Sequence, residues 1–311
     1  MLPVVCFEKL LCMITQFYDY LRYELNRSPL TVEAYRSDIT QFKEWISPSD
    51  PEKTDFKTIT ANDVRAWLAS MSRSGQNPRT LRRKIITLRT LFRWMMKNNL
   101  IKKSPLLDIP LPKIPKPLPD IIKPEEIETS LTTLKESDEE EPLKTMKILV
   151  VEILYSLGIR RAELIGINDE DISFSKAEIK VTGKRSKQRV VPVPQRLLDL
   201  IKKWQHLRDN GTERYNESRP LLEIKGKRIS ASKVYKIVHD TLIEVSARKK
   251  SPHALRHSFA SGMLNGGAEI DSVKEFLGHA SLATTQIYTH ISLSEIKKAY
   301  STAHPRSANK E

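Results

Sequence analysis

The sequence predicts a mainly α-helical protein with a small antiparallel β-sheet, divided into two domains. Apolar residues recur at spacings of three and four over most of the chain, short alternating segments follow one another in its second half, and a proline-rich stretch separates the two parts. At 311 residues the chain can bury two cores of ordinary size. We expect a helical domain at 13–102, a linker at 103–124 and a mixed domain at 125–311.

Amphipathic helices are predicted for the first domain. One begins at Pro29, a second near Thr60 and a third at Pro78, each after a residue or pair suited to a helix start. Met13 directly precedes another amphipathic segment, so it is an alternative to Met1 as the natural start.

The region between Lys103 and Pro124 contains six further prolines and is predicted to be an extended linker. Proline removes the backbone donors that a helix or a central strand requires. Such a tether can let two domains grip opposite sides of a duplex.

The second domain is predicted to mix helices with short strands. A buried helix runs from Met146 to Leu157 and is expected to end at Gly158. Alternating segments predict an antiparallel sheet with strands at 171–175, 178–181 and 189–193. Further helices are predicted at 194–208, 230–247, 252–265, 269–277 and 281–287.

The charge balance favours a polyanionic partner. Lysine and arginine number 52 against 38 acidic residues, for a formal net charge of +14. Each phosphate neutralised by such a cation releases condensed counterions, so nucleic acid is the first candidate and a basic protein without such a ligand is the alternative. The only cysteines, Cys6 and Cys12, lack metal-ligand spacing, and the short apolar start is interrupted by Glu8. We therefore expect a cytosolic protein without disulfide, metal site or membrane segment.

The third predicted helix carries a basic face beside its apolar stripe, rotated from it by roughly 115°. This face consists of Arg79, Arg82, Arg89 and Arg93. No acidic residue occurs from 77 to 107, which favours contact with DNA phosphates over a merely solvated surface.

Two motifs in the second domain place cations near turns. Arg160 follows the helix-ending Gly158, and Glu163 lies three positions on and could orient its guanidinium, although this spacing is more often an exposed ion pair. The turn at 181–189 presents several cations at a hairpin tip, where a lysine could reach a leaving oxygen or simply touch the DNA backbone. Composition does not favour Lys184 over Lys187 for this role.

The segment His253-Ala-Leu-Arg256-His257 places imidazole and guanidinium on one helix. Two histidines four apart can bind zinc, but the zinc-protease pattern needs Glu where this chain has Ala254. His253 and Arg256 share a face and can both point at a phosphate, whereas His257 is expected to pack or cap.

The most specific motif runs from Gly278-His279 to Tyr288. A phenol can attack a phosphodiester that guanidinium and imidazole groups hold and assist. Neither Tyr155 nor Tyr300, the nearest alternatives, lies nine residues after a Gly-His pair. With these motifs the chain resembles the tyrosine recombinases of the phage integrase family, and the Xer group within them, over nearly its whole length.

The resemblance implies an N-terminal helical core-binding bundle, which is SAM-like, and a C-terminal tyrosine-recombinase catalytic fold. The family's catalytic set falls on Arg160, Lys184, His253, Arg256, His279 and Tyr288. His279 would donate a hydrogen bond to the phosphate. Two residues depart from the family pattern: Arg185 replaces a glycine of the hairpin, which puts the pose of Lys184 in doubt, and Arg161 follows the first catalytic arginine.

The chemistry implied by the resemblance needs neither metal, cofactor nor ATP. Tyr288 would attack the phosphate and form a 3′-phosphotyrosyl link, leaving a free 5′-hydroxyl. Arg160 and Arg256 would clamp the non-bridging oxygens, His253 would accept the tyrosine proton and Lys184 would protonate the leaving oxygen.

The expected partners are a double-stranded recombination site and further recombinase subunits, the same or related, in a tetramer on two duplexes. The tail 293–300 is expected to dock on a neighbouring subunit, with folding back on its own domain as the alternative. Three functions are open: chromosome dimer resolution of the Xer type, integration or inversion by a mobile element, and DNA binding without catalysis. The residues name neither the recombination site nor whether a second recombinase or a DNA translocase is required.

Overall fold

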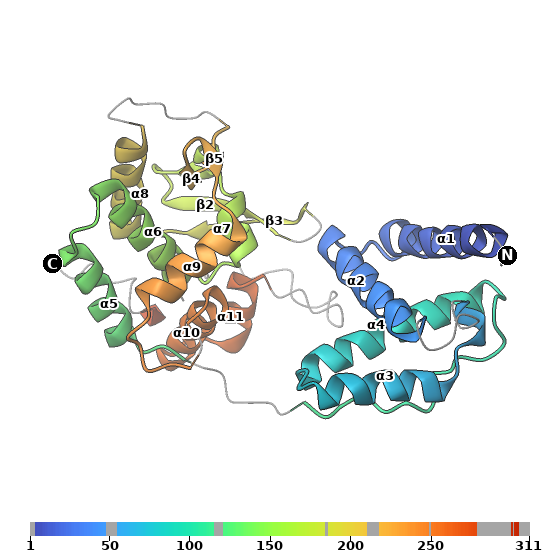
Figure 1. The fold of residues 1–311 in the computed structure, drawn as a ribbon. Helices are drawn as coiled ribbons and strands as arrows, with labels where there is room; N and C mark the ends of the chain where they lie inside the picture. The colour runs from blue at the N-terminus through green and yellow to red at the C-terminus, as the bar shows by residue number, and fades with distance from the viewer. Residues whose placement is uncertain are drawn as a thin grey trace. The chain divides into compact units, whose positions relative to one another are not determined.

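The computed structural model describes residues 4–47, 55–114, 121–183, 186–209, 218–248, 250–278, 300 and 302–304. The chain forms two compact units, Met1–Pro117 and Leu118–Glu311, called here the N-terminal and C-terminal units (Figure 1). Both are rich in helix, and small antiparallel sheets occur in the second, which confirms the predicted fold class. The domain boundaries drawn from the sequence stay predictions. No described helix is long and apolar enough to span a membrane.

The N-terminal unit is built from helices. In chain order its elements are α1 (Val4–Asp19), the π-helical η1 (Tyr20–Glu24), α2 (Pro29–Ile46), the 3-10 helix η3 (Phe56–Thr58), α3 (Ala61–Arg73) and α4 (Pro78–Lys97). The three predicted helices are confirmed, with a Thr60–Asp63 capping box at the start of α3 and an Asn77 cap on α4. Met13 lies inside α1 instead of just before a helix, because α1 begins at Val4.

The core of the N-terminal unit extends into the predicted linker. Phe42 and Trp67 pack with ring centroids 4.9 Å apart. Leu106 and Ile109 are buried in the same core, although the residues around them form no helix or strand. The first part of the predicted linker is therefore anchored to this unit by apolar side chains between its prolines.

The C-terminal unit surrounds the buried helix α6 (Glu141–Leu157). Its other helices are α5 (Pro124–Glu136), α7 (Arg161–Gly166), the 3-10 helix η4 (Asp169–Asp171), α8 (Gln195–Arg208), α9 (Ala231–Thr241), α10 (Pro252–Asn265) and α11 (Ile270–Phe276). Helices α8, α9 and α10 pack against α6 (Figure 1). Helix α5 was not predicted, although Pro124 in its first turn followed by Glu125 and Glu126 is a helix-start signal.

A three-stranded antiparallel sheet lies next to α7. Its strands are β1 (Ile172–Ser173), β2 (Glu178–Thr182) and β3 (Gln188–Pro192), in that order, as predicted. Arg189 pairs with Val181, and Val191 pairs with Ile179. Because directly opposed residues share a face, Arg189 lies on the same side of the sheet as these buried apolar residues. The hairpin of β4 (Glu223–Ile224) and β5 (Lys227–Arg228) was not predicted from the sequence.

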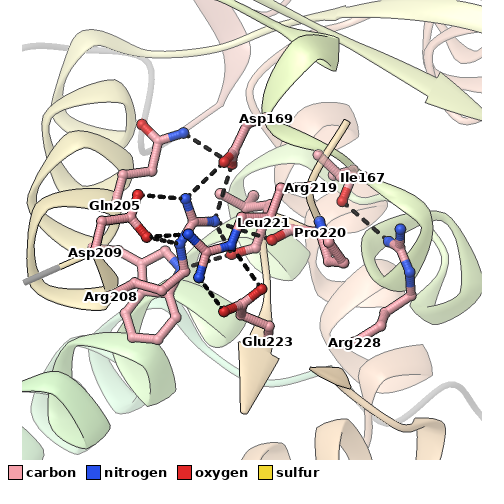
Figure 2. A network of polar contacts seen from close by, with 11 residues as sticks. Ile167, Asp169, Gln205, Arg208, Asp209, Arg219, Pro220, Leu221, Glu223 and Arg228 are labelled. Atoms are coloured by element: carbon pink, nitrogen blue, oxygen red, sulfur yellow. Dashed lines mark hydrogen bonds and ion pairs between the residues drawn. The ribbon is translucent and has the colours of Figure 1, made fainter. Parts of the chain in front are cut away.

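A buried polar network ties α8 to the η4 and β4 segments (Figure 2). Arg208 at the end of α8 bonds Asp169 at 2.6 Å and Asp209 at 2.8 Å. Arg219 bonds Asp209 at 2.7 Å and also Glu223. Each buried charge thus has an opposite partner, which offsets the cost of removing it from water.

Tyr300 and His304 pack on the C-terminal unit. Tyr300 stacks on Phe276 with centroids 5.5 Å apart and on His304 at 5.2 Å. The end of the predicted tail thus folds back on its own unit. The helix predicted at 281–287 and the tail residues 293–299 lie outside the described residues.

Candidate active site

The first candidate, Arg160, caps α7. Its backbone N–H donates to Glu163 Oε2 at 2.9 Å, and its Nη1 donates to Oε1 at 2.8 Å. The Glu163 side chain is only 2% exposed, whereas that of Arg160 is 43% exposed. The pair is therefore not the exposed ion pair that is usual at this spacing: a buried carboxylate orients a guanidinium that still reaches solvent.

Arg189 is a second partner of the same carboxylate. Its Nη1 and Nη2 donate to the two oxygens of Glu163 at 3.0 and 2.9 Å, and its Nε donates to the Phe276 carbonyl at 3.1 Å. The sequence interpretation treated Arg189 as one of several cations at a hairpin tip, and this was wrong. Arg189 lies two residues before the apolar Val191 in the same strand, and residues two apart share a face of the sheet. This spacing was the signal that could have found it.

Four hydrogen bonds keep Glu163 ionised. Burial by itself raises the pKa of this carboxyl, but the hydrogen bonds and charges of Arg189 and Arg160 outweigh burial and lower the pKa to about 2. The carboxylate is therefore charged throughout the neutral range, and it balances one of the nearby guanidinium charges.

Arg256 approaches from α10 and is 6% exposed. Its Nη1 donates to the Gly158 carbonyl at 2.6 Å and its Nη2 to the Leu277 carbonyl at 2.7 Å. Burial, together with the positive charge of Arg160, lowers the pKa of Arg256 to about 10. The guanidinium remains a cation at neutral pH, in surroundings where an anion would relieve the repulsion.

Three arginines meet where α11 ends. The carbonyls of Phe276, Leu277 and Gly278 accept hydrogen bonds from Arg189, Arg256 and Arg160 respectively, the last at 3.4 Å. Helix C-termini leave carbonyls without intrahelical donors and carry partial negative charge, so cations are favourable there. Chain segments that are far apart in sequence thus converge on the residues just before His279.

His253 lies in the first turn of α10, which Ser251 caps by accepting the Ala254 N–H at 3.2 Å. It is exposed, and its Nε2 lies 3.1 Å from Nε2 of His257. His257 was expected to pack or cap, and this was wrong: it is exposed beside His253. Among the described residues, no group of three or more His, Cys, Asp or Glu could hold a metal ion.

The remaining candidates, Lys184, His279 and Tyr288, lie outside the described residues. Gly183 and Gly278, which directly precede Lys184 and His279 in the sequence, lie beside Glu163 and Arg189. A Cβ built on Gly183 would lie 3.3 Å from Glu163 Oε1. Gly278, which directly precedes His279, would bring a Cβ within 3.2 Å of Arg189 Nη1.

Comparison with known proteins identifies the family. The phage integrase family model matches residues 121–295, and the phage integrase N-terminal SAM-like domain matches residues 14–99. A tyrosine recombinase XerC of Alcanivorax borkumensis is 32% identical over 299 residues, covering 96% of this chain and 95% of its own. The chain belongs to the tyrosine recombinases of the phage integrase family.

Other recombinases agree in sequence and fold. Tyrosine recombinase XerC of Pelotomaculum thermopropionicum is 34% identical, with 94% of this chain and 98% of that protein covered. The XerH site-specific recombinase bound to its difH substrate has a TM-score of 0.66 at 25% identity, covering 93% of this chain and 84% of that one. A lambda integrase dimer bound to a core site has the same fold, with a TM-score of 0.66 at 15% identity over 90% of this chain and 98% of that one. The resemblance to the Xer group is confirmed.

The basic face of this recombinase lies on α4, in the N-terminal unit. Arg79 and Arg93 are exposed, and Arg82 is half-buried. Arg89 differs because its Nη2 donates to the Ile109 carbonyl at 2.5 Å and so holds the segment after α4. Among the described residues, Arg79, Arg82 and Arg93 form no ion pair.

A buried acidic partner of α4 comes from α2. Asp38 is buried and accepts hydrogen bonds from Arg83 at 2.5 Å, Lys84 at 3.1 Å and Thr87 at 2.9 Å. The basic face is therefore distinct from the cations that α4 uses for packing.

Proposed function

We propose that the chain is a site-specific DNA recombinase that cuts and rejoins duplex DNA through a 3′-phosphotyrosyl intermediate, and that it resolves chromosome dimers. The convergence of Arg160 and Arg256 at the end of α11 supports this, because it sets two guanidinium groups at the residues that directly precede His279 in the sequence. Planar guanidinium donors suit the charge on a phosphate in a displacement reaction.

In the proposed cleavage step, Tyr288 Oη forms a bond to phosphorus and the bond from phosphorus to the 5′-oxygen breaks. His253 accepts the phenol proton, and Lys184 supplies a proton to the leaving oxygen. His279 donates a hydrogen bond to the phosphate. Because the ester bond is conserved in the phosphotyrosyl link, attack by a partner strand's 5′-hydroxyl reverses the step and joins new strands.

We propose that both units bind DNA. The α4 residues Arg79, Arg82 and Arg93 are proposed to contact phosphates, with Arg89 doing so only if it leaves Ile109. We propose a tetramer of this or a related recombinase on two duplexes, acting in the cytoplasm. The DNA complexes of XerH and of a lambda integrase dimer support DNA binding and multimeric assembly. A DNA translocase is a further proposed partner, to be tested on the assembled complex.

Covalent capture on DNA tests the proposal. Genomic fragments bound by the protein first supply the recombination site, and nicked duplexes of that site then trap the cleaved intermediate. We expect an adduct with the unaltered protein and with Tyr235→Phe, which changes an exposed tyrosine of α9, but none with Tyr288→Phe. An adduct with Tyr288→Phe would refute the assignment of the nucleophile, and DNA binding without any adduct would leave a non-catalytic binder.

The same fragments separate the two recombinase functions. One site near the replication terminus indicates chromosome dimer resolution, which the XerC relatives favour. Scattered inverted repeats would indicate a mobile-element integrase or invertase, the alternative that shares the site chemistry.

A further inference from the structure

Arg189 is not in the predicted catalytic set, yet it contacts the framework of the cluster as Arg160 does. Its three described hydrogen bonds go to both Glu163 oxygens and to the Phe276 carbonyl. It therefore connects strand β3 with the start of α7 and with the end of α11. These two connections reach α7, which begins directly after Arg160, and the end of α11, which precedes His279 in the sequence.

We propose that Arg189 is a positioning residue for DNA cleavage, which fixes the Glu163–Arg160 pair and the exit of α11 in one geometry. The proposal rests on the strand-transfer function proposed above. Arg189 acts on the phosphate through other residues, since its donors end on protein oxygens.

The exposures of the two arginines on Glu163 separate their roles. The Arg189 side chain is 19% exposed and grips the carboxylate with both terminal nitrogens. The Arg160 side chain is 43% exposed and uses a single terminal nitrogen on the carboxylate. Arg160 is thus able to turn donors toward a phosphate, and Arg189 holds the carboxylate that orients it.

The Phe276 bond extends this control to the nucleophile's segment. Two residues after Phe276 comes Gly278, whose φ of +65° is a left-handed backbone conformation. A Cβ built on Gly278 would lie 3.2 Å from Arg189 Nη1, so a larger residue there would press on the arginine side chain. The Phe276 hydrogen bond therefore holds the end of α11, directly before the residues that carry His279 and Tyr288 in the sequence.

The role requires the shape of guanidinium and not only its charge. A lysine has one nitrogen on a flexible stem, so it cannot bridge both carboxylate oxygens while also reaching the Phe276 carbonyl. Arg189→Lys keeps a cation next to the buried Glu163 but loses the paired hydrogen bonds that guanidinium makes to both carboxylate oxygens. This makes it the informative variant, because it avoids leaving the carboxylate without a positive neighbour.

We would measure DNA affinity and single-turnover cleavage of the nicked duplex by full-length Arg189→Lys. Affinity should stay close to that of the unaltered protein, because the described hydrogen bonds of Arg189 all end on protein oxygens. Cleavage should slow by about 100-fold, as expected when reacting groups shift by about 1 Å. Arg219→Lys is the matched control: Arg219 is 25% exposed and grips Glu223 with a similar fork, in the network of Figure 2. It should cleave at the unaltered rate.

A sulfur substrate identifies which part of the site is displaced. When sulfur replaces the 5′-bridging oxygen, the leaving group departs without a proton from Lys184. We expect the same fold-reduction in cleavage rate, Arg189→Lys against the unaltered protein, on the sulfur-containing strand as on the ordinary strand. Restoration of the rate by sulfur would place the defect at the hairpin lysine and overturn the proposal.

Melting temperatures separate positioning from folding. If Arg189→Lys melts at a lower temperature than Arg219→Lys, we would measure the cleavage rates of Arg189→Lys, Arg189→Gln and Arg219→Lys at a temperature at which all three are folded. Both Arg189 variants should still cleave slowly there. Cleavage by folded Arg189→Lys at the unaltered rate would refute the inference while leaving the recombinase function intact. If the unaltered protein forms no adduct, the proposed function itself fails.

Discussion

Glu163 shows how a single buried side chain organises the candidate site. Its oxygens accept four hydrogen bonds, two from Arg160 and two from Arg189. An unpaired carboxylate in this position would be costly to bury, but the surrounding donors make the charged form the stable one. The same bonds that orient Arg160 thus also contribute to folding.

The low pKa of Glu163 predicts a contribution to stability that disappears in acid. A folded-state pKa of about 2, against an ordinary value of 4.5, stabilises the folded protein above about pH 5 by about 3 kcal/mol. This contribution is lost as the pH falls toward 2. The free energy of unfolding, measured with urea over the pH range where the protein folds, should therefore differ most between the unaltered protein and Glu163→Gln near neutrality. A difference that is constant with pH would contradict the prediction.

Gly158 illustrates a second residue-scale constraint. It ends α6 with φ at +55°, and a Cβ built on it would lie 2.3 Å from Phe259 Cδ1. Gly158→Ala should lower the free energy of unfolding by about 3 kcal/mol, from backbone strain and overpacking together. In Gly166→Ala the new Cβ meets nothing within 4 Å, so chemical denaturation should show little change. Equal losses in both variants would mean that the close approach to Phe259 is not the cause.

At the scale of the element, α4 has a packing face and a separate basic face, which we propose contacts DNA. Leu88 and Phe92 are buried in the core, and Lys84 is held by Asp38 of α2 and lies over the Trp67 ring. The arginines of the basic face lie elsewhere around the helix. A helix can divide its surface in this way because residues three and four apart share a side.

This division predicts the effect of charge removal on DNA binding. Arg82→Ala combined with Arg93→Ala should weaken binding and reduce the slope of log affinity against log salt by about 0.9 for each lost phosphate contact. Lys97→Ala is the control on the same helix, because Lys97 pairs with Glu24. Fluorescence anisotropy across a salt series measures both. Slopes that match the control would show that the basic face is only solvated.

At the scale of the molecule, the net charge of +14 and the arginine cluster have separate roles in the proposed function. Affinity from the charge is independent of base sequence and falls with salt, whereas we propose that cleavage depends on the geometry around Glu163. For a protein that contacts roughly 6–10 phosphates, affinity should fall about 1,000-fold or more between 50 and 200 mM salt. Titrations of the full-length protein on one duplex check this, and an affinity insensitive to salt would contradict the electrostatic account.

Much of the fold was predictable because local patterns agreed with the tertiary structure. The helix that ends at Gly158 and the helices starting at Pro29 and Pro78 follow their start and stop signals. The β4–β5 hairpin was not found, since two strands of two residues each are too short for an alternating pattern. Motif spacing together with the family resemblance led to Arg160 and Arg256 as candidates.

The sequence by itself determined the family, the helix-rich two-domain class, the basic character and the types of residue that the chemistry needs, because these depend on composition and on local spacing. Only the tertiary structure decided that Glu163 is buried, that Arg189 turns inward to grip it, and that three arginines cap the end of α11. Those partners are up to 118 residues apart along the chain. Their meeting depends on how strands and helices pack, and burial and charge pairing at long range leave no periodic signal in the sequence.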